Sequence, residues 1–543
     1  MKCKAFFCAL LLANTSYSAL CFSAPALSEP NLQALNKNNQ NENKKVILNE
    51  ENDVKTSSRE ITFFLRNVSL NDNTFNNSPQ LIEIFNKNTN KKVSIDDLYT
   101  IVSEITLLYR NNGYPAATAY IPEQNSKDGS IRINVEKGRL GDVIVENSSH
   151  LTDRIVKLLV SDLEKGEVIK TSKLESIVGN IQGLGANAYC MLKSGNKLGE
   201  SDIVFSVEKI KSNNFSIYTD NHGSKSSGKY RTTVLWNTYN LAGNGEQITV
   251  SGLLSNEKQK NYSVQYNQII DKNGSKLGIM LSNSDYELGN VYSELGAKGN
   301  SSSIGIYGSI PLKKRLYSRI DFKYGWNYRK LKDELTAFDY IIKKHSNSFN
   351  IGIDGIEKSG KLFSNYDLSF CRGILGYDDA RIGSIPLLVN NNGSYSKMFL
   401  NTAFNYSFNS NVNLLLTLQA QKAFNDLDSS EQFYLGGGNA VRAYPQGEAS
   451  GDEGYQASLE LNFKTKVKGL DLALFYDIGH IKYSHSNSNY GGTTLEGYGV
   501  GLRYNYNGYW AKLDYARRIG LAKNTSDQAN DKGRIWFVIG KTW

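Results

Sequence analysis

The sequence predicts two small α+β domains in tandem, each with the order β-α-α-β-β, followed by a sixteen-stranded antiparallel transmembrane β-barrel. Helical periodicity occurs in two tandem blocks before residue 211, each time in two helices flanked by strand patterns. From Asn214 onward it gives way to segments that alternate apolar and polar residues. The connections between these segments are short on one side and mostly long on the other, as in outer-membrane barrels.

The composition agrees with this class. The 543 residues include 33 Tyr and 47 Gly but 8 Pro, which favours strands joined by hydrophilic turns. The formal net charge of +9 comes from 62 basic and 53 acidic residues that are spread along the chain. The sequence therefore does not predict a nucleic-acid-binding protein.

Residues 1–26 are predicted to be a secretory signal peptide. Lys2 and Lys4 precede an apolar run over 5–13 that is too short to span a membrane. A lipoprotein signal at Cys21 is less favoured, because Leu20 occupies the position that a small residue normally takes. No later stretch has the roughly 18 consecutive apolar residues of a transmembrane helix.

Residues 27–58 are rich in Asn, Lys and Glu and are predicted to be a leader or linker; whether they form a plug helix is left open. The first domain is predicted over 59–139. Its expected strand, two helices and two strands are Ile61–Leu70, Pro79–Asn88, Ile95–Arg110, Ala116–Ile121 and Ser130–Val135. One buried stripe is expected in the second helix, formed by Ile95, Leu98, Tyr99, Val102, Ile105, Leu108 and Tyr109.

The second domain is predicted over 140–211 and repeats the order. Its expected elements are Asp142–Glu146, Asp153–Val160, Lys173–Ile181, Ala188–Lys193 and Asp202–Ile210. The two units are either small structural modules or a pair of docking domains, since open sheet edges in both can accept an added strand. Cys190 and Cys371 fall in different predicted domains, so we expect two buried free thiols rather than a disulfide.

The barrel is predicted over 212–543. Its sixteen strands are expected to begin near residues 215, 230, 246, 261, 275, 300, 316, 346, 361, 396, 412, 454, 469, 493, 508 and 533. Roughly 330 residues over sixteen strands give about 20 residues per strand and connection, the size expected of an outer-membrane barrel. The chain stops at Trp543 inside the last predicted strand, where closure leaves no exposed edge.

The connections give a second indication. Short turns such as NLAGNGE and PLKK follow the even strands, whereas long connections over 330–347, 377–394 and 424–453 follow odd ones. This asymmetry is typical of bacterial outer-membrane barrels and puts the two N-terminal domains on the short-turn, periplasmic side. The alternative is a soluble β-sandwich, which the signal peptide, the even strand number and the loop asymmetry disfavour.

The longest hydrophilic interruption, over 424–453, lies between strands eleven and twelve. Gly436, Gly437 and Gly438 precede VRAYPQGE, in which Arg442 is the single basic residue. Three glycines permit sharp or left-handed backbone that other residues resist. A loop with this much local detail is expected to have a function of its own.

These features together resemble the two-partner secretion transporters, the haemolysin- and haemagglutinin-secretion outer-membrane proteins whose N-terminal units are POTRA domains. The resemblance covers residues 60 to 543. LYRNNGYPAATAYIPEQ resembles the end of a POTRA unit, VRAY the family's VRGY motif, and FYDIG its F-x-D-x-G strand motif. Ala443 stands where the family has glycine. The motif residues are Val441, Arg442, Ala443 and Tyr444 in the loop and Phe475, Asp477 and Gly479 in the strand.

The resemblance implies that the loop folds into the barrel lumen, where Arg442 pairs with Asp477 through two hydrogen bonds. It further implies an outer-membrane pore that exports one large, unfolded, β-rich exoprotein of haemolysin or adhesin type. The POTRA domains would recognise the N-terminal secretion domain of that partner. The barrel would lie in outer-membrane lipid, inserted by the barrel-assembly machinery through the strand that ends at Trp543.

The sequence predicts no enzyme, cofactor or metal site. The histidines are scattered, and no H-E-x-x-H, paired-cysteine, G-x-S-x-G or Walker spacing occurs. Two other functions stay open. One is a barrel-assembly insertase of the same superfamily, and the other is a passive porin or adhesin barrel, for which the two N-terminal domains would be unexplained. An outer-membrane lipase or protease would lack a nucleophile and base.

Overall fold

The computed structural model describes residues 62–126, 128–197, 199–315, 318–387, 393–484, 491–520, 525–526 and 532–543. The predicted signal peptide and leader lie outside the described residues, as does His485. The chain divides into two compact units that meet between Ile210 and Lys211. Among the described residues, no helix is both long and apolar enough for a membrane span.

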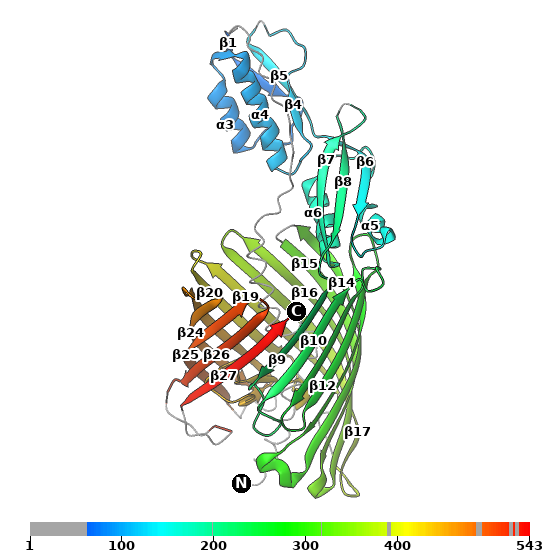
Figure 1. Cartoon of the computed structure of the whole chain (residues 1–543), viewed down its shortest axis with the longest axis vertical. Helices are drawn as coiled ribbons and strands as arrows, with labels where there is room; N and C mark the ends of the chain where they lie inside the picture. Colours follow the sequence, from blue (N-terminus) through cyan, green and yellow to red (C-terminus); the bar gives the residue numbers. More distant parts are fainter. Residues whose placement is uncertain are drawn as a thin grey trace. The chain divides into compact units, whose positions relative to one another are not determined.

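The first domain has two helices packed on short sheets (Figure 1). β1 pairs antiparallel with β3, while β5 pairs parallel with β2 and antiparallel with β4. β3 was not predicted, since four residues with two lysines give no clear alternation. The elements are β1 (Thr62–Leu65), β2 (Asn67–Leu70), α3 (Pro79–Asn88), β3 (Lys91–Ser94), α4 (Ile95–Asn111), β4 (Thr118–Tyr120) and β5 (Ser130–Glu136).

Local side-chain caps explain where α4 begins. The Ser94 hydroxyl accepts a hydrogen bond from the Asp97 amide at 3.1 Å, and the Asp97 carboxylate accepts one from the Ser94 amide at 2.7 Å. The predicted stripe is wrong at two positions, because Ile95 is 36% and Tyr99 63% exposed. Tyr99 lies about 100° around the helix axis from Leu98, outside the buried arc. The buried positions of α4 are Leu98, Ile101, Ile105, Leu108 and Tyr109.

The second domain repeats the arrangement with a three-stranded sheet in the order β6-β8-β7. Its junction with the first domain is at Gly138, which has a φ of +74° and no room for a Cβ beside Ala116. Cys190 is buried here as a free thiol, and Cys371 is buried in the barrel, as predicted. The elements are β6 (Arg139–Asn147), α5 (Asp153–Val160), α6 (Thr171–Gln182), β7 (Ala186–Ser194) and β8 (Glu200–Lys209).

Sixteen long strands of the described chain form a closed barrel, with the two-residue β18 added beside β17. The predicted starts agree closely; the largest difference is at β16, expected near 346. The strands are β9 (Asn213–Asp220), β10 (Arg231–Tyr239), β11 (Gln247–Ser255), β12 (Lys260–Ile269), β13 (Lys276–Glu287), β14 (Ala297–Arg315), β15 (Ser318–Leu335), β16 (Tyr340–Ser359), β17 (Leu362–Ile382), β18 (Ile385–Pro386), β19 (Gly393–Ser407), β20 (Val412–Ala423), β23 (Glu453–Lys464), β24 (Leu470–Lys482), β25 (Gly492–Tyr506), β26 (Tyr509–Arg518) and β27 (Gly533–Thr542).

The barrel closes between its last and first strands. β27 pairs antiparallel with β9 from Val538 opposite Asp220 to Thr542 opposite Ser216. Trp543 lies one residue beyond β27 rather than inside it, and its amide donates to the Phe215 carbonyl at 2.9 Å. The closing ladder satisfies backbone groups that could not find partners in lipid.

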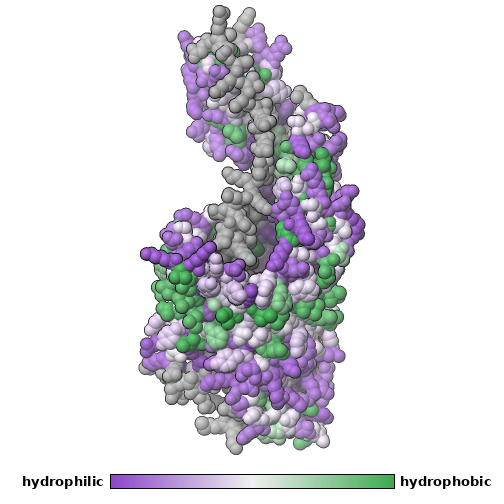
Figure 2. All heavy atoms as spheres, viewed as in Figure 1, coloured by the Kyte–Doolittle hydropathy of each residue, from purple (hydrophilic) through white to green (hydrophobic). Residues whose placement is uncertain are grey.

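Side chains alternate between lipid and lumen along the strands. On β24, Leu472, Leu474 and Tyr476 are exposed, whereas Phe475 and Asp477, on the other face of the strand, are buried. Apolar residues gather in a band across the barrel wall (Figure 2). The inward set on each strand therefore lines the lumen.

Of the predicted long connections, 330–347 is largely strand, and in the described part of 377–394 strand extends to Ile382, covers Ile385–Pro386 and resumes at Gly393. β15 and β16 continue to a hairpin in which Leu335 pairs with Tyr340, joined by the 3₁₀ turn η4 (Thr336–Phe338). These two residues pack with Tyr286 in a small apolar cluster. The prediction failed because the charged composition of this extension, suited to a strand in water, hides the alternation.

Candidate functional site

The site is built on the connection between β20 and β23. Its backbone forms the 3₁₀ turn η5 (Ser429–Glu431) and a hairpin of β21 (Phe433–Leu435) with β22 (Ala449–Gly451). We call residues 427–435 and 449–452 the stem, and residues 436–448 the tip. The predicted motif lies in the tip.

Glycines permit the sharp turn from stem to tip. Gly436 and Gly437 have φ values of +90° and +116°. A Cβ at Gly436 would lie 2.5 Å from the Pro445 carbonyl oxygen, and one at Gly437 2.0 Å from the Gln446 side-chain oxygen. Residues with side chains would therefore be strained and crowded at both positions.

The tip places Arg442 against the barrel wall. Its Nε and Nη2 donate to the two carboxylate oxygens of Asp477 at 2.8 and 2.7 Å, and its backbone amide donates to the same carboxylate at 3.1 Å. The side chains of Arg442 and Asp477 are 4% and 0% exposed. The structure thus brings the two motif residues together as a bidentate, buried ion pair.

Two more wall carboxylates face the same guanidinium. Nη1 of Arg442 lies 2.9 Å from Glu460 on β23 and 3.3 Å from Asp514 on β26. Arg503 on β25 bridges these two acids, at 2.6 Å from each. We call Arg442, Glu460, Asp477, Arg503 and Asp514 the tip cluster. Its charges are nearly balanced, which is what lets them be buried.

Aromatic side chains complete the contacts of Arg442. The guanidinium carbon lies 3.3 Å from the ring centroid of Phe475, in a cation–π arrangement. The indole of Trp536 on β27 donates to the Arg442 carbonyl at 2.6 Å. Phe475, found as part of the strand motif, therefore contacts the arginine directly.

The remaining motif residues pack around the arginine. Val441 belongs to an apolar cluster with Leu435, and Ala443 packs with Phe475. Gly479 admits the tip closely, since a Cβ there would lie 3.2 Å from the Val441 side chain. Tyr444 is half-buried beside both clusters.

The barrel wall leaves space for the side chain of Ala443. A Cβ at Gly497 of β25 would lie 2.4 Å from the Cβ of Ala443. Gly497 on the wall strand therefore leaves space for the methyl group of Ala443 in the loop.

A second charged cluster holds the stem, with the signs reversed. Asp428 pairs with Lys344 of β16 at 2.7 Å, and Glu431 pairs with Arg329 of β15 and with Lys397 of β19, the latter at 2.9 Å. The side chains of Glu431, Lys344, Arg329 and Lys397 are buried, that of Asp428 is 9% exposed, and we call the five the stem cluster. The loop thus carries its cation at the tip, while Asp428 and Glu431 in the stem pair with cations of the wall.

The stem carboxylates are stabilised as anions. Burial raises the pKa of Asp428, but the Lys344 ammonium outweighs burial and holds that pKa below its usual range. Burial likewise raises the pKa of Glu431, but the positive charges of Lys397 and Arg329 outweigh burial and hold that pKa below its usual value. Both groups therefore stay charged at neutral pH.

Sequence reasoning missed the wall acids Glu460 and Asp514, Trp536, and the whole stem cluster. A usable signal existed for the acids, because each lies at an inward position of an alternating strand. For the stem cluster there was none, since Arg329 and Glu431 are far apart in the chain.

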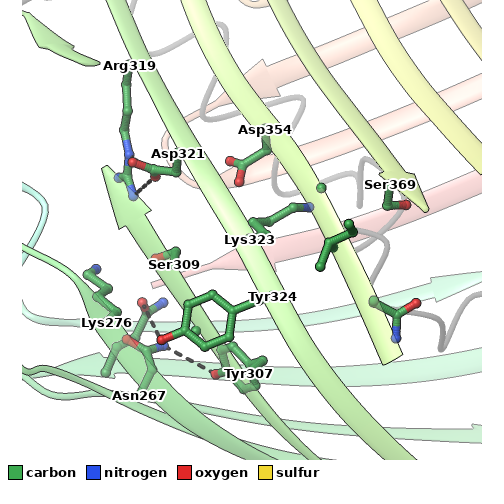
Figure 3. Close-up of a pocket in the computed structure, with 15 residues that line it drawn as sticks. Asn267, Lys276, Tyr307, Ser309, Arg319, Asp321, Lys323, Tyr324, Asp354 and Ser369 are labelled. Atoms are coloured by element: carbon green, nitrogen blue, oxygen red, sulfur yellow. Dashed lines mark hydrogen bonds and ion pairs between the residues drawn. The ribbon is translucent and has the colours of Figure 1, made fainter. Parts of the chain in front are cut away.

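The opposite part of the wall holds a polar pocket of about 200 Å³. Figure 3 shows its charged lining, in which Arg319 contacts Asp321 and Lys323 lies near Asp354. The lining mixes both signs with Asn267, Tyr307 and Ser369. Within the described ranges, no group of three or more His, Cys, Asp or Glu could hold a metal ion.

Comparison with known families identifies two segments. Residues 199–504 match the family described as "Haemolysin secretion/activation protein ShlB/FhaC/HecB". Residues 63–138 match the "POTRA domain, ShlB-type". The first match spans more than half of the chain.

Among curated proteins, the chain is 29% identical over 491 residues to the "Heme/hemopexin transporter protein HuxB" of Haemophilus influenzae, covering 86% of this chain and 84% of that protein. It is 20% identical over 463 residues to the "Outer membrane transporter CdiB" of Dickeya dadantii, covering 81% and 80%. Among solved structures, CdiB from Escherichia coli aligns with a TM-score of 0.68 at 18% identity, over 96% of this chain and all of that one, which shows a shared fold.

Proposed function

The chain belongs to the haemolysin secretion/activation protein family represented by ShlB, FhaC and HecB, and on that premise we propose that it exports one large, unfolded, β-rich exoprotein. It is an outer-membrane β-barrel transporter of the two-partner secretion type with POTRA domains in the periplasm. The exported protein, its recognition and the role of the loop are our proposals.

The proposed route runs through the barrel lumen, and the tip must rearrange to open it. The observation that carries this proposal is the buried pair of Arg442 with Asp477, which fixes the tip to the inner wall. A paired charge holds its position strongly when buried, because removing one partner leaves the other stranded. The same pair can therefore set the closed position of the loop.

The POTRA domains are proposed to capture the partner by strand addition. β4 and β7 each end a described sheet, and they carry Tyr120 and Tyr189, both more than a third exposed. An extended segment could pair with either edge and cover the tyrosine beside it. Replacing Tyr189 by proline, which cannot donate to the ladder, should weaken capture without touching the buried core.

The decisive experiment replaces Arg442 by alanine in cells that carry the partner. We expect the large exoprotein to disappear from the medium and surface while the barrel inserts normally. The matched control is Arg372→Ala, which removes an exposed arginine from β17 and should leave export unchanged. Normal export by Arg442→Ala would refute the role of the loop.

The same cells separate the alternative functions. An insertase would cause a general fall in other outer-membrane barrels when the chain is deleted, and a passive pore or adhesin would change neither readout. The name of the 29% identical relative supports a haem- or hemopexin-handling partner. Capture of the exported protein on immobilised haem or hemopexin would test that choice.

A further inference from the structure

The loop is held at two places whose restraints differ in number. In the tip, Arg442 makes the ion pairs with the acids of the wall, Val441 and Ala443 add apolar contacts, and the Glu448 carboxylate accepts a hydrogen bond from the Ser526 hydroxyl at 2.7 Å. The stem depends on Asp428 and Glu431, each of which has at least two wall partners. Removing the Arg442 side chain therefore removes every ion pair between the tip and the acids of the tip cluster, whereas removing Asp428 or Glu431 leaves the stem paired through the other acid.

Backbone contacts add to the restraint on the stem. The Glu431 carbonyl accepts hydrogen bonds from Lys397 at 2.9 Å and from Gln421 at 3.0 Å. Asp452 closes the other arm, accepting from the Gln432 side chain at 3.0 Å and from the Ser484 amide at 2.9 Å. The hairpin of β21 with β22 ties the two arms together.

The charges left behind also differ. Without Arg442, three acids of the tip cluster remain on the wall: Glu460, Asp477 and Asp514. Two cations remain beside them, Arg503 and Lys512, the latter 3.6 Å from Asp514, so three negative charges face two positive ones. Without Asp428 and Glu431, the wall of the stem cluster keeps three cations, Arg329, Lys344 and Lys397. One wall acid, Asp333, still attracts Lys344. The wall at the tip is thus left with a net charge of −1 and the wall at the stem with a net charge of +2. Loss of the stem acids therefore leaves more unpaired buried charge than loss of Arg442.

A hinge lies where the two parts meet. Gly436 and Gly437 occupy positive φ at the start of the tip, and Gly447, with a φ of +68°, lies at its end. Glycine changes φ and ψ at little steric cost, so these positions can absorb a swing of the segment between them.

We propose that Asp428 and Glu431 are positioning residues that keep the stem docked on the barrel wall during export, and that loop movement is confined to the tip. The proposal rests on the proposed function, in which the loop rearranges to let the chain pass. The stem then stays as a permanent partition of the lumen, and the tip alone acts as the gate.

Spin-label distances on the purified full-length protein test this. One label goes to Lys260, an exposed residue at the start of β12, and the second to Asn439 in the tip or Ser450 in the stem, each replaced by cysteine. Cys190 and Cys371 are buried, and a labelled unsubstituted chain measures any background from native cysteines. Distance distributions are then compared among variants.

In Arg442→Ala, the Asn439 distribution should widen by on the order of 10 Å, as expected for a freed segment of this length, while the Ser450 distribution stays narrow. In Asp428→Asn/Glu431→Gln, both distributions should widen. Lys344→Arg, which keeps the charge, should leave both narrow. Barrel folding is checked in each variant by heat-modifiable electrophoretic mobility.

Two outcomes would overturn the proposal: a Ser450 distribution that widens in Arg442→Ala as much as that of Asn439, or one that stays narrow in the stem double variant. If the double variant does not fold, the Arg442→Ala comparison alone still decides. No partner is present, so the result is independent of whether export occurs. Loss of secretion in Arg442→Ala tests the proposed function separately.

Discussion

The POTRA domains and the barrel bury opposite kinds of side chain. In the first POTRA domain, Leu65 and Ile101 are completely buried in an apolar core. In the barrel, Val264 faces outward and is 44% exposed, whereas Asp321 and Asp477 are buried inside. Lipid replaces water around the wall, so the apolar side chains belong outside.

The difference teaches where stability and function reside. A POTRA domain depends on packing of its apolar side chains, because little else offsets the entropy of ordering the chain. The barrel wall is held by a closed backbone ladder. Its inward side chains are therefore free to position a loop and to line a path.

The largest effect should come from emptying a POTRA core. Phe205 is fully buried in the second domain, and Phe205→Ala should cost about 3–5 kcal/mol of that domain's stability. This loss of stability is measured by proteolysis of the full chain in detergent at increasing urea concentrations, with the amount of intact POTRA fragment as the readout. Phe64→Ala removes the same side chain from a site that is 48% exposed, and an equal loss there would break the comparison.

A charge on the lipid face should cost somewhat less. Val264→Arg on β12 is expected to destabilise the barrel by about 2–4 kcal/mol if it lies near the membrane midplane. Gln265→Arg places the same side chain one residue later, toward the lumen, and should be tolerated. Unfolding of the two variants from lipid vesicles compares them, and similar values would mean that the assigned faces are wrong.

A half-buried charge in a POTRA domain, Asp72, gives a smaller, pH-dependent effect. Burial raises the pKa of Asp72, but hydrogen bonds from Lys137 and Thr74 outweigh it and lower that pKa from 3.8 to about 2. Because the folded pKa is depressed, its stabilisation is complete above about pH 4 and is lost as the pH falls toward 2. Asp72→Asn should cost about 1–2 kcal/mol at neutral pH.

The stability of Asp72→Asn relative to the unsubstituted protein should converge at low pH. Chemical unfolding of the full chain between pH 2 and 7 measures this convergence. Glu83→Gln changes an exposed carboxylate in the same domain and is the control. A pH-independent difference between Asp72→Asn and the unsubstituted protein would show that the ion pair with Lys137 contributes nothing.

The smallest effect concerns packing inside the lumen. Gly497→Ala should displace the tip, because its new Cβ would lie 2.4 Å from that of Ala443. Ala443→Gly alone should change little, and the double variant should regain the normal tip position. Export and the spin-label distance to Asn439 are measured for each variant. If Ala443→Gly does not restore the tip position in Gly497→Ala, the two residues do not contact each other as described.

The order of the helices and strands, and most of their starting residues, could be predicted from the residue pattern alone. Period-two alternation marks each barrel strand, because one face meets lipid and the other water along its whole length. Helical periodicity located α3 and α4 at their observed starts, Pro79 and Ile95. In the β15–β16 extension that signal failed, because its many charged residues hide the alternation, although Leu331, Asp333 and Leu335 are buried on one face.

The pairing of Arg442 with Asp477 was expected from resemblance to a family, and not from the residues alone. Only the tertiary structure decided that Glu460 and Asp514 share the same guanidinium, because strand register and barrel closure determine which inward positions meet. It also decided that Arg329 and Lys397 hold Glu431. Alternation assigns a side chain to the lumen, but it carries no information about which residue faces it across that space.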